Sequence, residues 1–261
     1  MNAQNRPLGS FAEVNGLKMY YEVHGDGRPL VLIHGGGSTI ESTFGRLLPI
    51  FAKSHQVIAV ELQAHGHTKD IDRPLSFEQD ADDVAALLHQ LRIERADFMG
   101  FSNGGTTCLQ IAIRHPALVD KLVLASATFK RNGMPPGFFD GFEHVTLATM
   151  PAPLRDAYLK ANPDRKGLQA MFDRDVARMA GFRDISDEDI RSIQAPALVI
   201  NGDSEVVLAA HALALSKTLR RARLAILPSG HGDYLGEICA EDSRSRLPEF
   251  VAGMIEEFLA E

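Results

Sequence analysis

One serine stands in a pattern that suits nucleophilic chemistry, Gly100-Phe-Ser102-Asn-Gly104. The motif lies between an apolar run, Ala96 to Met99, and a helix-like stretch, Thr106 to His115. At a sharp strand-to-helix turn a serine is held with its hydroxyl projecting outward, and glycines on either side allow the backbone to approach itself closely. The spacing therefore makes Ser102 the candidate nucleophile.

A serine hydroxyl needs a histidine to take its proton and a carboxylate to orient that histidine. Among ten histidines, His231 is the best candidate, because it follows an apolar run, Leu224 to Leu227, and a Pro-Ser-Gly turn. Such a turn falls at the carboxyl edge of a parallel sheet, where ligand sites gather. His34 and His65 lie in glycine turns and are expected to serve packing. Six further histidines carry no motif that indicates a site: His24, His55, His89, His115, His144 and His211.

Neither a metal nor a cofactor is predicted. His65-Gly-His67 has the spacing of a metal-binding pair, but no third ligand clusters with it. The two cysteines, Cys108 and Cys239, have no neighbouring cysteine, and so few in a chain without a signal sequence are expected to be reduced.

The elements that must position these residues alternate between continuous apolar runs and amphipathic stretches such as Phe77 to Leu91. Continuous runs are typical of strands buried on both faces, so the pattern predicts an α/β fold with a mostly parallel sheet flanked by helices. Asn15-Gly16 between Phe11 to Val14 and Lys18 to Val23 predicts an antiparallel hairpin at its start. The expected core strands are Leu30 to Ile33, Val57 to Val60, Ala96 to Phe101, Leu122 to Ala125, Ala197 to Ile200 and Leu224 to Leu227.

One connection is far longer than a crossover needs, and it predicts an inserted helical cap over residues 128–194, with the core formed by 1–127 and 195–261. A helix is expected from Lys166 to Ala180, and Ser186 to Asp189 resembles a helix-capping sequence. Six of the 14 phenylalanines and four of the eight methionines lie in the cap, which suits a pliable apolar wall over a site.

Composition favours a small-molecule partner. The 261 residues are 45% hydrophobic, enough for a sizeable core, and the net charge of −7 offers no basic surface for nucleic acid or anionic membrane. No apolar run is long enough to span a bilayer, and residues 1–7 lack the apolar centre of a secretory signal. A cytoplasmic protein is expected, of an oligomeric state that the sequence leaves open.

These motifs together resemble those of the α/β-hydrolase superfamily, in particular its capped serine hydrolases, over nearly the whole chain. Five segments in the family's order carry the resemblance: His34-Gly-Gly-Gly37, Ala64-His-Gly-His-Thr68, Gly100-Phe-Ser-Asn-Gly104, Gly202-Asp-Ser-Glu205 and Gly230-His231. The resemblance implies the eight-stranded fold of that superfamily with an inserted cap.

The resemblance also implies the rest of the site. The loop after Ile200 offers two acids, and the family's usual spacing from the strand-ending glycine favours Glu205, with Asp203 as the alternative. Whichever acid is not used is expected to cap the following helix, near residues 207–219. The oxyanion hole needs one backbone N–H from the residue after the nucleophile and one from the loop after the third strand, which implies Asn103 and Gly36.

A serine nucleophile narrows the reaction. Epoxide and haloalkane hydrolases of the superfamily use an aspartate instead, and the absence of tryptophan argues against a halide site. The leading hypothesis is hydrolysis of a carboxylic ester or lactone of a small to medium, largely uncharged substrate. One alternative is a carbon–carbon bond hydrolase acting on a keto acid, for which Arg155, Lys160 or Arg174 could bind the carboxylate. The other is a non-catalytic small-molecule receptor, since fold alone does not give function.

Overall fold

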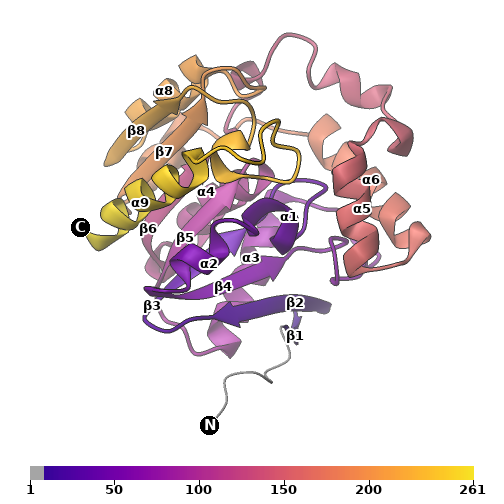
Figure 1. The fold of residues 1–261 in the computed structure, drawn as a ribbon, viewed down its shortest axis with the longest axis horizontal. Coiled ribbons are helices and arrows are strands. Elements are labelled where there is room, and N and C mark those ends of the chain that lie inside the picture. Colours follow the sequence, from indigo (N-terminus) through magenta and orange to yellow (C-terminus); the bar gives the residue numbers. More distant parts are fainter. Residues whose placement is uncertain (1–8) are drawn as a thin grey trace.

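A single sheet of eight strands runs through the protein in the order β1-β2-β4-β3-β5-β6-β7-β8 (Figure 1). The computed structural model describes residues 9–261. The expectation that residues 1–7 form no secretory signal therefore lies outside the described residues. The strands are β1 Ser10–Val14, β2 Leu17–His24, β3 Arg28–Ile33, β4 His55–Glu61, β5 Ala96–Phe101, β6 Val119–Ala125, β7 Ala197–Gly202 and β8 Ala222–Leu227. β2 pairs antiparallel with β1 and β4, and the other pairs are parallel. The predicted mostly parallel sheet with an antiparallel edge is confirmed.

The continuous apolar runs are divided between two cores, one on each face of the sheet. In β3, Val31 and Ile33 belong to one core and Leu30 and Leu32 to the other. Successive side chains of a strand point to opposite faces, so a strand that is covered on both sides must be apolar at every position.

Helices cover both faces (Figure 1). The helices are α1 Ile40–Phe44, α2 Leu48–Phe51, α3 Phe77–Gln90, α4 Asn103–Arg114, α5 Ala152–Ala161, α6 Arg165–Ala180, α7 Asp187–Ser192, α8 Ala209–Thr218 and α9 Leu247–Ala260. α3, α4 and α8 contribute to the core that contains Ile33, whereas α1, α2 and α9 contribute to the core that contains Leu32. The helix expected from Phe77 begins where predicted, because the Ser76 side chain accepts a hydrogen bond from the Gln79 N–H as an N-cap.

Helices α5, α6 and α7 lie in the long connection between β6 and β7, together with three short 3₁₀ turns, Arg131–Gly133, Asp140–Glu143 and Leu147–Thr149. Ser186 caps α7 by accepting from the Asp189 N–H, as its sequence predicts. Tyr158 of α5 packs with Leu168 and Met171 of α6 in a small core that also includes Ala64 from the loop after β4. This segment therefore has internal packing, and α5 also contacts α1 of the main body (Figure 1).

The loops that follow β3, β5, β6, β7 and β8 all leave the same edge of the sheet, because these strands are parallel. Ligand sites of open α/β folds gather at this carboxyl edge. Among residues 9–261, no helix is long and apolar enough to cross a lipid bilayer.

Candidate active site

Ser102 lies at the sharp turn that the sequence predicts. β5 ends at Phe101, α4 begins at Asn103, and Ser102 between them has φ 53° and ψ −119°. A positive φ is strained for a residue with a side chain, and such strain clusters at functional sites. The flanking glycines are required by close packing: a Cβ on Gly100 would lie 2.1 Å from the Gly104 carbonyl oxygen, and a Cβ on Gly104 would lie 2.1 Å from the Ile33 carbonyl oxygen.

The glycine loop after β3 lies directly against this turn. A Cβ built on Gly35 would be 3.5 Å from the Cβ of Ser102, and one built on Gly36 would be 2.5 Å from Asn103 Nδ2. The structure thus brings Gly36 and Asn103, the two candidate oxyanion donors, next to each other beside Ser102. A Cβ at position 36 would meet the end of the Asn103 side chain, which would have to shift to make room for it.

Glu205 makes the contact expected of the acid. His231 Nδ1 lies 2.5 Å from Glu205 Oε2, and the Glu205 side chain is fully buried. Glu205 Oε1 accepts hydrogen bonds from the Gly202 N–H and from Ser126 Oγ. The ring of His231 packs against Phe101, the residue before Ser102, with centroids 4.8 Å apart. Within residues 9–261 no hydrogen bond occupies His231 Nε2, which leaves that nitrogen as the candidate proton acceptor.

Asp203 has a different role. Its Oδ1 accepts a hydrogen bond from the Ser229 N–H at 3.1 Å, which joins the loop after β7 to the turn before His231. The expectation that the unused acid caps the next helix is wrong. Helix α8 begins at Ala209 with Leu208 at its N-cap position and no side-chain cap, and Asp203 lies five residues before that position.

Two residues of this arrangement, Ser126 and Tyr234, were not predicted from the sequence. Ser126, with φ 49°, follows β6 and donates its hydroxyl to Glu205 at 2.8 Å, and Ser126 Oγ lies 2.6 Å from Tyr234 Oη. Tyr234 is fully buried, and burial together with the nearby Glu205 raises its pKa well above the ordinary value, so it remains a proton donor. The only signals in the sequence were a serine directly after an apolar strand and a tyrosine three residues after His231.

A family model described as alpha/beta hydrolase fold matches residues 28–170, more than half of the chain. This protein belongs to the alpha/beta hydrolase fold family. The match includes β3, the glycine loop, the Ser102 turn and the first part of the helical segment between β6 and β7.

Individual relatives of this hydrolase are similar over different lengths. Serine hydrolase BPHL of Homo sapiens is 27% identical over 238 residues, 83% of this chain and 77% of that protein. 2-Hydroxymuconate semialdehyde hydrolase of a Pseudomonas species is 36% identical over 129 residues, 48% of this chain and 46% of that protein. The solved structure of Est816, described as an N-acyl homoserine lactone degrading enzyme, is 25% identical with a TM-score of 0.74, covering 95% of this chain and all of that one.

The substitution Ser126→Ala tests whether the Ser126 hydroxyl supports Glu205, the candidate acid. Ser126→Ala removes the hydroxyl that donates to Glu205 and leaves a buried carboxylate oxygen one hydrogen bond short. We expect the free energy of unfolding to fall by about 1–3 kcal/mol, and kcat on an ester substrate to fall about tenfold because the acid is held less firmly. Tyr234→Phe, which keeps the Ser126–Glu205 bond, is the matched control. Equal kcat in wild type and Ser126→Ala would contradict this support role.

An apolar cavity of about 230 Å³ opens beside the glycine loop. Gly36 and Gly37 form one wall, and Met150, Leu154 and Phe172 of the helical segment lie among the residues of the other. The only charged side chain in its wall is Asp175 of α6. The cavity therefore suits an apolar group held close to Gly36, one of the two candidate oxyanion donors.

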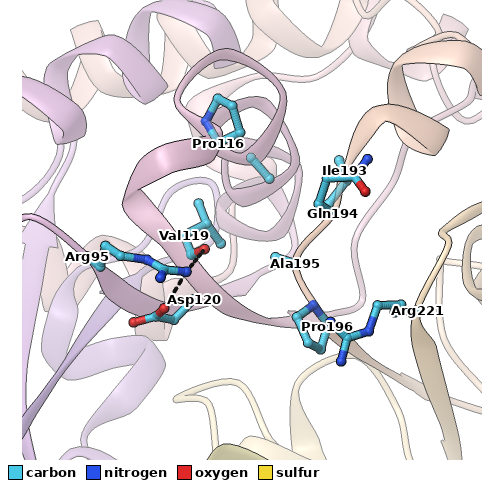
Figure 2. A pocket seen from close by; sticks show the side chains of 10 residues that line it. Arg95, Pro116, Val119, Asp120, Ile193, Gln194, Ala195, Pro196 and Arg221 are labelled. Carbon is cyan, nitrogen blue, oxygen red and sulfur yellow. Dashed lines mark hydrogen bonds and ion pairs between the residues drawn. The ribbon is translucent and has the colours of Figure 1, made fainter.

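A second cavity, of about 320 Å³, lies away from this site (Figure 2). It is lined by residues such as Val119 at the start of β6 and Pro196 just before β7, and its Arg95 is paired with Asp120. These positions lie at the amino ends of the strands, the edge opposite to Ser102. No candidate site residue lines this cavity, which is therefore separate from the candidate active site.

The basic residues considered for a substrate carboxylate are all engaged away from the apolar cavity. Arg174 pairs with Asp70, Lys160 pairs with Glu41, and Arg155 donates to the carbonyl of Leu147. None of the three lines the cavity.

His65 and His67 do not face a common ligand. His65 contacts Asp175, whereas His67 contacts Glu61, which also accepts from the His67 N–H. Over residues 9–261, no group of three histidine, cysteine, aspartate or glutamate side chains has the geometry of a metal site.

Proposed function

We propose that this protein is a serine hydrolase that cleaves a carboxylic ester or lactone of a small to medium, largely uncharged substrate through an acyl-enzyme on Ser102. The observation that carries the proposal is the buried Glu205 against His231, beside a serine in a strained turn. This is the set of parts that acyl transfer needs: a nucleophile, a base, an orienting acid and backbone donors for the oxyanion.

In the first half of the reaction, Ser102 Oγ attacks the substrate carbonyl carbon while His231 Nε2 takes the serine proton. Glu205 holds the ring with its proton on Nδ1 and stabilises the imidazolium that forms. The N–H groups of Gly36 and Asn103 bind the oxyanion. When the tetrahedral intermediate collapses, the carbon–oxygen bond to the leaving alcohol breaks, and His231 returns its proton to that oxygen.

In the second half, His231 takes a proton from water, whose oxygen attacks the acyl carbon. The bond between Ser102 Oγ and the acyl carbon then breaks, and the proton passes from His231 to Ser102. A lactone follows the same steps, with the alcohol remaining attached to the acid product. The segment 128–194 is proposed to act as the cap, because its side chains form the outer wall of the apolar cavity.

The choice of an ester or lactone over a keto acid rests on charge. A carboxylate-bearing substrate needs a cation, yet the cavity has no basic residue in its wall and has the Asp175 carboxylate there instead. The similarity to 2-hydroxymuconate semialdehyde hydrolase over about half of the chain supports carbon–carbon cleavage as the competing activity. The lactonase description of the Est816 neighbour supports the proposed class.

Labelling with a fluorophosphonate tests the mechanism without a known substrate. We expect a covalent adduct on Ser102, located by peptide mass spectrometry, and labelling at least about 100-fold slower in His231→Ala because the base is absent. A panel of p-nitrophenyl esters, lactones and a dienoic keto acid then assigns the class. A folded wild-type protein that takes no label would contradict the proposal and favour a non-catalytic receptor. Turnover of the keto acid alone would instead assign carbon–carbon bond cleavage.

A further inference from the structure

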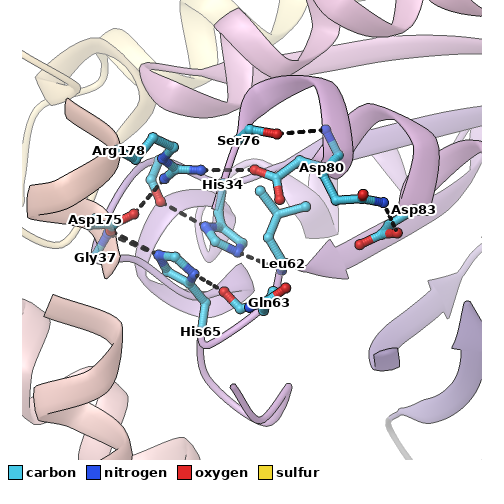
Figure 3. Close-up of polar contacts among 12 residues, drawn as sticks. His34, Gly37, Leu62, Gln63, His65, Ser76, Asp80, Asp83, Asp175 and Arg178 are labelled. Atoms are coloured by element: carbon cyan, nitrogen blue, oxygen red, sulfur yellow. Dashed lines mark hydrogen bonds and ion pairs between the residues drawn. The ribbon is translucent and has the colours of Figure 1, made fainter. Parts of the chain in front are cut away.

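A carboxylate from the helical segment reaches the glycine loop. The Gly37 N–H donates to Asp175 Oδ2 at 2.6 Å, although the two residues are 138 positions apart in the chain (Figure 3). Gly37 adjoins Gly36, the proposed oxyanion donor, and has φ +67°. The contact therefore fixes the orientation of the peptide group between Gly36 and Gly37. The preceding peptide group carries the Gly36 N–H that must point at the oxyanion.

The other contacts of Asp175 form a buried network of alternating charge (Figure 3). His65 Nε2 lies 3.0 Å from Asp175 Oδ2, and Arg178 pairs with both Asp175 and Asp80. The side chains of His65, Arg178 and Asp80 are each at most 3% exposed. Buried ion pairs of this kind are sensitive to the loss of one partner, since the other is left uncompensated.

The surroundings of His65 favour its charged form. Its Nδ1 faces the carbonyl of Gln63 at 2.8 Å and its Nε2 faces Asp175, so both ring nitrogens have acceptors to which they can donate. Burial disfavours the charged ring, but the Asp175 carboxylate outweighs it and raises the pKa of His65. Burial likewise disfavours the Asp175 anion, yet His65 and Arg178 hold its pKa well below the usual range.

The position of Asp175 explains why two basic side chains, His65 and Arg178, contact it. A Cβ on Gly36 would lie 3.4 Å from Asp175 Oδ2, so the carboxylate lies beside the residue whose N–H is proposed to bind the oxyanion. An uncompensated negative charge at that place would repel the oxyanion and weaken the hole. His65 and Arg178 neutralise it, which lets Asp175 hold the loop without this cost.

We propose that Asp175 is a positioning residue that holds the oxyanion loop in its catalytic geometry from the cap, with His65 as the cation that makes this compatible with oxyanion formation. The inference rests on the proposed function, because it assigns a role in transition-state stabilisation. It links docking of α6 onto the sheet to the rate of acyl transfer.

Replacement of Asp175 by asparagine tests the positioning role. Asp175→Asn retains the size of the side chain but removes the charge that binds His65 and Arg178. We expect kcat on a p-nitrophenyl ester, per active site titrated with fluorophosphonate, to fall about tenfold, less than the roughly 10²–10³-fold loss on deleting an oxyanion donor. KM should change less than about threefold, because the donors act on the transition state. Asp173→Asn, an exposed position on the same helix, is the matched control and should match wild type.

The pH profile tests His65. The groups that face it are Asp175 and Arg178 of α6, Asp80 of α3 and His34 after β3. Burial lowers the pKa of His34 to about 3, so His34 stays neutral at ordinary pH. A raised pKa means that the His65 charge is present at lower pH and is lost as pH rises through that pKa. We expect a loss of kcat on the alkaline side in wild type that is absent in His65→Gln, whose kcat is lower throughout.

The double variant completes the test. If both residues act through one contact, the loss of kcat in Asp175→Asn with His65→Gln should be smaller than the product of the single losses. A kcat per titrated site equal to wild type in Asp175→Asn, with Tm alone lowered, would overturn the positioning role and leave the proposed function intact. If kcat falls with rising pH in the same way in wild type and His65→Gln, the positioning role is overturned even if Asp175→Asn does not fold. A wild type that neither takes label nor turns over esters would overturn the proposed function and this inference together.

Discussion

Ser102→Ala should abolish turnover of any ester that the wild type hydrolyses, with kcat lowered about 10⁵-fold or more. The reason is that no other hydroxyl occupies the strained turn beside the glycine loop. The measurement is steady-state hydrolysis of the best ester from the panel, with freshly purified variant to exclude contamination by wild type.

Stability provides the control for this variant. Alanine must adopt the same positive φ as serine, so Ser102→Ala should unfold at nearly the wild-type Tm, whereas Ser102→Gly should be more stable by about 1–3 kcal/mol because the strain is relieved. Both variants should be equally inactive. A kcat for Ser102→Ala within tenfold of wild type would assign the nucleophile elsewhere.

Glu205→Gln should lower kcat about 10⁴-fold while leaving the fold intact. Glu205 Oε1 accepts from the Gly202 N–H and from Ser126 Oγ, so the amide oxygen of a glutamine will take that place. Its NH₂ group then faces His231 Nδ1 and favours the tautomer with the proton on Nε2, which cannot accept the proton of Ser102. The expected result is therefore a chemical defect with little change in KM.

Asp203→Asn is the matched comparison, because it is the same change of charge two residues away. Asparagine retains an oxygen that can accept from the Ser229 N–H, so kcat should remain within about threefold of wild type. Rates of both variants on one ester, each corrected for the fraction of folded protein, decide between the two acids. Loss of activity in Asp203→Asn with activity kept in Glu205→Gln would reverse the assignment.

Local sequence determined the architecture of this protein. Continuous apolar runs such as Leu30 to Ile33 favour strands covered on both faces, and the Asn15-Gly16 pair favours a tight antiparallel turn. The Ser102 turn was likewise readable, because the glycines that it needs for close backbone contact stand within two residues of it. These features depend on neighbours in the chain, so their spacing is enough to predict them.

The tertiary structure decided contacts between polar side chains that residue spacing leaves open, although the family resemblance already favoured Glu205 over Asp203. Glu205 and Asp203 differ by two positions, and only the place of Ser126 after β6 and of His231 after β8 separates their partners. The contact between His65 and Asp175 joins residues 110 positions apart. Such contacts form because parallel strands bring distant loops to one edge of the sheet and a long insertion folds back over that edge. Hydrophobic periodicity describes neighbours in the chain, so it does not predict contacts between residues so far apart in the sequence.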